Sequence, residues 1–217
     1  MTLEEYVTWA ATVGLEPGPD ARSERGLTAL GLGLASEVGA GVLVRWLRGE
    51  ARDRGELADE LGDVAYWWAR LCAATGVGAS TLLARSRAHV EWRRAGRLPD
   101  GPASADAPAS LEDFAAWVRG TDGAPEDEAA LGDAGLALAG DAGEVVECLR
   151  KLGAGEEARR AQLAGELGDV WRHWTRLVAA TGVAPADLLD RSRTKIEARR
   201  AQVLANEGDA GAARERR

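Results

Sequence analysis

The chain repeats its own sequence, and this duplication limits the folds that it can adopt. The segment ELGDVAYWWARLCAATGV at 60–77 matches ELGDVWRHWTRLVAATGV at 166–183 at 13 of 18 positions. Residues 82–94 match 188–200 at 8 of 13 positions, and shorter upstream blocks pair in the same order. A period of about 106 residues is too long for a solenoid repeat. The sequence therefore predicts two tandem domains of similar fold.

Composition divides the chain into four parts. Residues 1–95 and 111–205 carry the two repeats, which we call the first and the second repeat. Residues 96–110 are rich in Pro, Gly, Ala and Ser and show no apolar period, which is typical of a linker. Residues 206–217 contain almost no large apolar side chain, so we expect a flexible tail there.

Each repeat is predicted to be helical. Thr2 and Ser110 precede acidic residues in the manner of helix caps, and Pro185 suits the first turn of a fourth helix. Apolar residues in the third helix recur at spacings of three and four, at Leu57, Leu61, Val64, Trp68 and Leu71. Strand-like alternation is missing. The prediction is an all-α protein with a four-helix bundle in each repeat, the alternative being two irregular helical domains.

Charge and composition exclude several classes of protein. The net charge is −8, which argues against a nucleic-acid polymer as partner. The two cysteines do not form a CxxC pair, which excludes a disulfide framework and a zinc–thiolate site. We expect no apolar stretch long enough to cross a bilayer and no secretory signal, and hence a cytoplasmic protein without a membrane partner.

Four carboxylates in the second repeat occur at spacings that suggest a metal site. Asp141 and Glu144 are three residues apart on the second predicted helix, and Glu166 and Asp169 are three apart on the third. Residues three apart share one helix face, so the four side chains converge if the two helices pack together. Such a cluster needs cations, and Mg²⁺ prefers oxygen ligands. The alternative is that both pairs lie on solvated helix surfaces.

The combined motif resembles the MazG-like all-α nucleoside triphosphate pyrophosphohydrolases. The acidic pairs are separated by 21 residues, and GELGDVWRHWTRLVAATGV is very similar to the third helix of that family. RSRTKIEARR resembles its fourth helix, with Lys195 and Arg199 at the matching positions and Ser192 where Asn is usual. Asp141 also departs from the pattern, since Glu is usual there.

This resemblance implies a Mg²⁺-dependent enzyme, with Mn²⁺ as a possible substitute, that cleaves a nucleoside triphosphate to the monophosphate and pyrophosphate. Its expected role is the removal of noncanonical or surplus nucleotides. The four acids of the second repeat would hold the metal, Glu144 or Glu166 would also act as the general base, and Lys195 and Arg199 would contact phosphates. The resemblance further suggests that the two repeats pack as an internal pseudo-dimer, with further homodimerisation possible.

The first repeat has an incomplete version of the acidic motif. It keeps Glu37, Glu60 and Asp63, but Ala40 stands at the place of Glu144. Fewer carboxylates should bind Mg²⁺ more weakly, because fewer charges offset the cost of dehydrating the ion. We therefore expect this degenerate site to be weak or inactive and the first repeat to serve as a structural partner.

Two further residues and two further functions remain open at this point. Arg172 could hold outer phosphates or form a structural salt bridge, and Trp171 could stack on a nucleobase or pack in the core. The chain could also be a non-catalytic nucleotide-binding or protein-interaction module with degenerate sites. A third possibility within the resemblance is a phosphoribosyl-ATP pyrophosphohydrolase.

Overall fold

Helices begin where capping residues predict them. In this computed structural model, the Thr2 side chain accepts a hydrogen bond from the backbone of Glu5, and the Glu5 side chain bonds back to Thr2. The Ser110 side chain accepts a hydrogen bond from the backbone of Asp113, and a later helix starts at Pro185, as predicted. The structure describes residues 1–14, 20–44, 46, 53–95, 110–153 and 159–215. Every regular element within these ranges is helical, which confirms the all-α class.

The two repeats contain matching helices. The first repeat forms α1 (Leu3–Thr12), α2 (Glu24–Ser36), the π-helix η1 (Glu37–Val44), α4 (Arg54–Thr75) and α5 (Ala79–Ala95). The second repeat forms α6 (Leu111–Asp122), α7 (Glu128–Gly153), α8 (Arg159–Thr181) and α9 (Pro185–Glu215). The single helix α7 therefore corresponds to α2 and η1 together.

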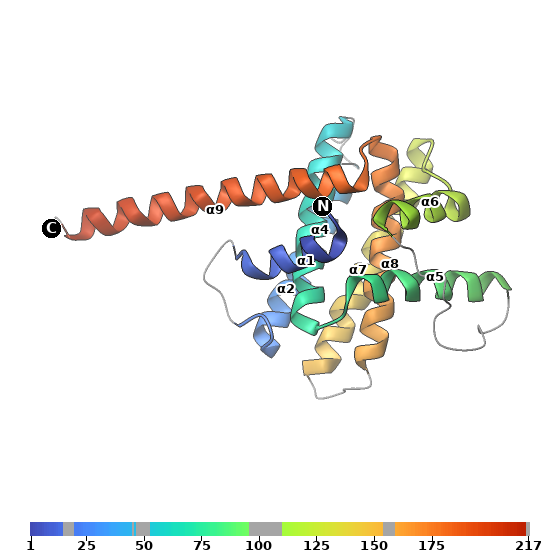
Figure 1. The fold of residues 1–217 in the computed structure, drawn as a ribbon, viewed down its shortest axis with the longest axis horizontal. Coiled ribbons are helices and arrows are strands. Elements are labelled where there is room, and N and C mark those ends of the chain that lie inside the picture. Colours follow the sequence, from blue (N-terminus) through green and yellow to red (C-terminus); the bar gives the residue numbers. More distant parts are fainter. Residues whose placement is uncertain (15–19, 45, 47–52, 96–109, 154–158, 216–217) are drawn as a thin grey trace.

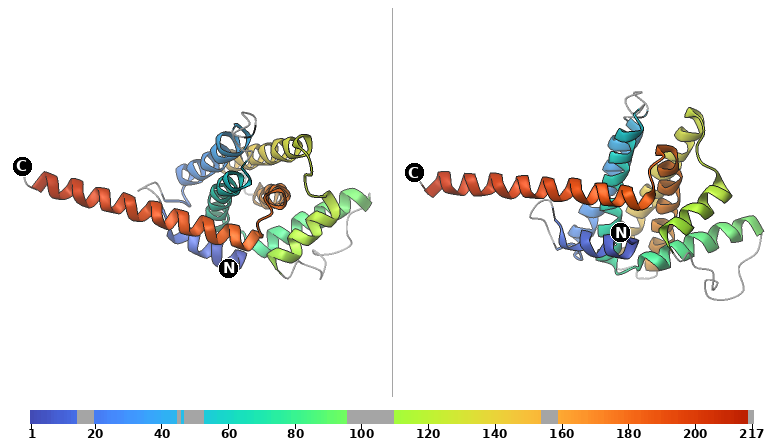
Figure 2. Two further views of the ribbon diagram at one scale, coloured as in Figure 1. Left: turned by 90° about the horizontal axis from the view of Figure 1, so that it is seen from above. Right: turned by 45° about the horizontal axis from the view of Figure 1, so that its top comes forward.

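The helices lie in three layers that mix the repeats. Figure 2 (left) shows α2 and α7 side by side in one outer layer, α4 and α8 in the middle, and the remaining helices on the other side. The fourth helix of each repeat packs mainly on the third helix of the other repeat: α9 on α4, and α5 on α8. The structure thus differs from the prediction that each repeat packs its own four helices into a bundle.

Two glycines make the turns that lead into the exchanged helices. Gly76 follows α4 and Gly182 follows α8, and both have φ near +70° (71° and 73°). This left-handed conformation suits glycine because it lacks a Cβ atom. Only a few residues separate each third helix from the next one. The fourth helix consequently leaves at a sharp angle and reaches across to the other repeat (Figure 1).

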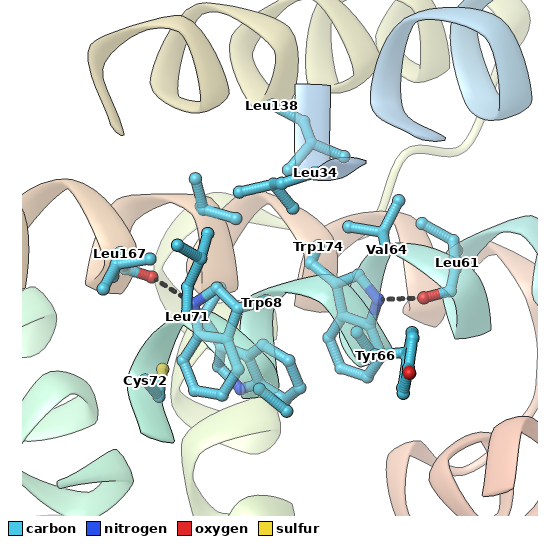
Figure 3. Packing of buried hydrophobic residues seen from close by; sticks show 14 of the residues in the cluster. Leu34, Leu61, Val64, Tyr66, Trp68, Leu71, Cys72, Leu138, Leu167 and Trp174 are labelled. Carbon is cyan, nitrogen blue, oxygen red and sulfur yellow. Dashed lines mark hydrogen bonds between the residues drawn. The ribbon is translucent and has the colours of Figure 1, made fainter. Parts of the chain in front are cut away.

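A reciprocal pair of tryptophans joins the two repeats inside the core. The indole Nε1 of Trp68 donates to the backbone oxygen of Leu167, and that of Trp174 donates to Leu61, both at 2.8 Å (Figure 3). Trp68 and Trp174 are fully buried, as the apolar spacing of the third helix predicts for Trp68. Cys72 is also buried and lies near Trp68. One hydrophobic cluster therefore spans both repeats.

One apolar segment corrects the prediction about membrane-spanning length. The continuous helical run Glu24–Val44 is long and apolar enough to cross a bilayer by length and composition. A core helix of a soluble protein meets the same criterion. In this structure the inward residues Leu30, Leu34 and Val38 belong to the shared core, and α2 packs on α4 and α7.

The predicted linker and tail are only partly described. Of residues 96–110, Ser110 alone lies within the described residues. The segment 206–217, predicted to be a flexible tail, continues α9 as helix to Glu215. This end of α9 projects well beyond the other helices (Figure 1).

Candidate functional site

Three carboxylates of the first repeat meet where η1 crosses α4. Glu37 begins η1, and Glu60 and Asp63 lie one turn apart on α4. Each offers one oxygen, and these oxygens all lie within 4.8 Å of one another. Among the described residues, this is the one group of three or more His, Cys, Asp or Glu side chains that meets this spacing. The cluster therefore forms in the repeat whose site the sequence predicts to be degenerate.

A glycine in the π-helix makes room for this cluster. A Cβ atom added to Gly41 would lie 2.5 Å from Oε2 of Glu60 and 3.4 Å from Oε2 of Glu37. Ala40, the position aligned with Glu144, is exposed. Gly41, four positions after Glu37 in η1, is therefore the residue over these two acids.

Two basic residues of the second repeat complete the cluster. Lys195 on α9 donates to Oδ2 of Asp63 at 2.7 Å and to the backbone oxygen of Asp59 at 3.2 Å. Arg199, one turn later, lies 3.6 Å from the same Oδ2 atom. Asp63 is only 5% exposed, and its other oxygen, Oδ1, is buried without a hydrogen-bond partner within the described part of the chain.

Burial and neighbouring charge shape the electrostatics of Glu37. Desolvation raises the pKa of this half-buried carboxyl, and repulsion from Asp63 and Glu60 raises it further. A hydrogen bond from Trp67 and the charge of Lys195 act in the opposite direction on the same pKa. The net direction of the pKa is upward, with burial as its largest cause.

Two of the four predicted metal ligands of the second repeat, Asp141 and Asp169, lie beside histidine side chains. Nδ1 of His173 lies 2.6 Å from Oδ2 of Asp141. Asp169 lies 3.4 Å from Nδ1 of His89, on α5 of the first repeat. Glu166 accepts a hydrogen bond from Gln162 at 3.3 Å. No three of the acids at 141, 144, 166 and 169, all within the described residues, meet the 4.8 Å spacing.

The second-repeat acids are nevertheless close enough to interact electrostatically. Burial raises the pKa of Glu166, and the charges of Glu144, Asp169 and Asp141 add to this rise, against the hydrogen bond from Gln162. Glu144 itself is exposed. The helices therefore bring the four predicted ligands to one region, but with wider separations than in the first repeat.

Two predicted substrate contacts have structural roles. Trp171 is fully buried and lies between Trp68 and Trp174, with ring centroids 4.2 and 4.1 Å away. These neighbours leave no ring face for a nucleobase, so core packing is the correct interpretation. Arg172 forms a 2.7 Å ion pair with Asp122 on α6 and lies 3.8 Å from Asp169. Of the two alternatives for Arg172, a phosphate contact or a structural salt bridge, these contacts match the salt bridge.

The first-repeat cluster has donor chemistry that suits a magnesium ion. Carboxylate oxygens are ligands that Mg²⁺ prefers, and oxygens on opposite sides of the ion lie about 4.2 Å apart. The cluster oxygens lie within 4.8 Å of one another, a limit that includes this value. The Oδ1 atom of Asp63, which has no hydrogen-bond partner among the described residues, is a further oxygen that could bind a cation.

The sequence did not predict that basic residues of each repeat face an acid of the other repeat. Lys195 and Arg199 belong to the second repeat but face Asp63 of the first, whereas His89 faces Asp169 of the second. Local sequence gives no signal for this exchange, because both third helices share the same ELGDV motif.

Comparison with known proteins identifies no relative of this chain. No family model matches the chain, and no curated protein or solved structure matches it either. The resemblance to the MazG-like enzymes therefore rests on the acidic motifs and the fourth-helix signature.

Proposed function

We propose that the chain is a Mg²⁺-dependent nucleoside triphosphate pyrophosphohydrolase whose site combines the two repeats as an internal pseudo-dimer. The observation that carries the proposal is the meeting of Glu37, Glu60 and Asp63 with Lys195 of the other repeat. Acids grouped at ligand spacing beside a lysine suit a triphosphate that arrives with a divalent cation.

The acidic and the basic residues of this site have different proposed roles. Glu37, Glu60 and Asp63 would hold the metal, which when bound would neutralise phosphate charge and activate a water molecule. Lys195 and Arg199 would bind the outer phosphate oxygens as charge-assisted donors. The water adds hydroxide to one phosphorus as the bond between the α- and β-phosphates breaks. Glu37, besides holding the metal, would accept the proton of this water as general base.

This proposal moves the predicted site from the second repeat to the first. The second repeat has four acids, but Asp141 and Asp169 face His173 and His89. The acids at 144 and 166 remain the sequence-based candidates for a site in that repeat. Because the two sites have matching glutamates, Glu60 and Glu166, their separate removal can distinguish them.

One observation favours a second candidate function, a non-catalytic binding module. The Lys195–Asp63 pair and the two His–Asp contacts already place basic groups on both acidic sites. In such a module the basic groups would act as fixed partners of the carboxylates. The chain would then bind a nucleotide or protein without cleaving it.

A substrate panel tests the function. The wild-type chain would be incubated with canonical, deoxy and deaminated nucleoside triphosphates and with phosphoribosyl-ATP, each with and without Mg²⁺. Chromatography would identify the products. We expect monophosphate and pyrophosphate only in the presence of the metal. Cleavage of phosphoribosyl-ATP alone would favour that specialised activity, and nucleotide binding without cleavage would favour the binding module.

A further inference from the structure

A chain of hydrogen bonds runs from α1 through α9 to α4 beside the first-repeat cluster. The hydroxyl of Tyr6 lies 2.7 Å from Oγ of Ser192, and Ser192 donates to the backbone oxygen of Gly62 at 2.7 Å. Because Ser192 has a single hydroxyl proton and gives it to Gly62, Tyr6 must donate to Ser192. Tyr6 is fully buried and Ser192 is 2% exposed.

This chain lies one helical turn from the Lys195–Asp63 ion pair. Gly62 directly precedes Asp63 on α4, and Ser192 is three residues before Lys195 on α9. The helices touch closely here, because a Cβ atom at Gly62 would lie 3.1 Å from the Cβ of Ser192. A hydrogen bond at this contact fixes how far α9 can slide or rotate on α4, and hence where the Lys195 ammonium lies.

The second repeat has the same crossing without the hydroxyl chain. Gly168 meets Ser86, with a Cβ-to-Cβ distance of 3.1 Å for an added Cβ. Phe114 stands at the place of Tyr6. Oγ of Ser86 is buried and has no hydrogen-bond partner in the described part of the structure. His89 takes the place of Lys195. The complete series of hydrogen bonds from Tyr6 through Ser192 to Gly62 therefore occurs beside the site that has the lysine.

We propose that Tyr6 and Ser192 are positioning residues that hold Lys195 in register with Asp63 for binding a triphosphate. The inference rests on the proposed function for its substrate, but the positioning itself can be measured without activity. Removal of the Tyr6 hydroxyl leaves Ser192 able to rotate away from Gly62. Lys195 then loses its fixed position, and phosphate binding weakens more than the chemical step.

Lysine NMR gives a direct readout of this position. The chain has two lysines, Lys151 and Lys195, so the ¹⁵N–¹H signals of their ammonium groups can be assigned with one Lys151→Arg variant. We expect Tyr6→Phe to shift the Lys195 signal and to speed its exchange with water. It should also raise KM for the triphosphate severalfold, with kcat changed by less than about twofold. Ser192→Ala should have the same effects.

Tyr66→Phe is the matched control. Tyr66 is also fully buried, and its hydroxyl donates to the backbone oxygen of Val13, away from Ser192. Both Tyr→Phe variants should lose melting temperature to a similar degree, but Tyr66→Phe should leave the Lys195 signal and KM unchanged. An unchanged Lys195 signal in folded Tyr6→Phe and Ser192→Ala would overturn the inference. Absence of pyrophosphate release from the wild type would instead reject the proposed function, and the NMR comparison would still decide the positioning role.

Discussion

Lys195 and Asp63 form an ion pair of 2.7 Å although they are 132 residues apart and belong to different repeats. The lysine is on the fourth helix of the second repeat, and the aspartate is on the third helix of the first. The ion pair forms because α9 of the second repeat packs on α4 of the first repeat, where the candidate site lies. The second repeat therefore supplies the lysine that lies beside the acids of the first repeat.

Removal of the Lys195 ammonium should weaken substrate binding. A hydrogen bond to a charged group contributes about 1.5 to 3 kcal/mol, so Lys195→Ala should raise KM for the triphosphate about 10- to 100-fold. Steady-state pyrophosphate release measures this change. Lys151→Ala provides the control, because Lys151 pairs with Glu147 on α7. Equal KM values for the two variants would contradict a phosphate-binding role of Lys195.

The space beside Gly41 should be needed for metal binding. A Cβ at this position would lie 2.5 Å from Oε2 of Glu60 and push that flexible carboxylate aside. Gly41→Ala should therefore lower Mn²⁺ affinity severalfold, measured by electron paramagnetic resonance, with little loss of melting temperature. Gly39 has open space around its Cβ position and lies in the same π-helix. Gly39→Ala should leave the affinity unchanged, and an equal loss in both variants would rule out the steric explanation.

The reciprocal tryptophans should stabilise the fold to a similar extent. Trp68→Phe and Trp174→Phe each remove a buried hydrogen bond between repeats and reduce core packing. Each should lower the free energy of unfolding by about 1 to 3 kcal/mol, measured by urea denaturation. Trp9→Phe removes an indole bond to Glu197 at an exposed site and should cost less. A loss confined to one of the two buried tryptophans would show that the two contacts are not energetically equivalent.

The raised pKa of Glu37 should make stability depend on pH in a specific direction. The folded state holds a proton on this carboxyl more readily than the unfolded chain does. Its contribution to the free energy of unfolding therefore falls as pH rises through the window between the ordinary glutamate pKa and the raised folded value. Glu37→Gln should raise the melting temperature at pH 7 in the absence of metal. The gain should shrink near pH 4, and a gain that is independent of pH would contradict this electrostatic origin.

Much of the helical content follows from the sequence, because the signals are local. Thr2 and Ser110 mark helix starts through their side-chain oxygens, and Pro185 marks the first turn of α9. The apolar spacing around Trp68 and Trp174 predicts their burial, since it depends only on helix geometry.

The exchange of helices could not be predicted in this way. The two third helices offer nearly the same surface to a fourth helix, so local sequence favours neither partner. Which third helix each fourth helix packs on depends on tertiary packing, with the chain turning at Gly76 and Gly182. The π-helix at Glu37–Val44 was also missed, because apolar spacing over eight residues does not separate it from an α-helix. The exchange of helices determines which basic residues face the acids, since it places Lys195 of α9 beside Asp63 of α4.

The proposed catalytic site consists of the first-repeat acids together with Lys195 and Arg199 of the second repeat. The most direct test measures Mg²⁺-dependent pyrophosphate release by Glu60→Gln beside Glu166→Gln, with the best substrate of the panel. These substitutions remove one charge at matching positions and keep the side-chain size. Glu60→Gln should lose at least about 100-fold in kcat, whereas Glu166→Gln should stay close to the wild type. Loss of activity in Glu166→Gln with Glu60→Gln unaffected would place catalysis in the second repeat instead.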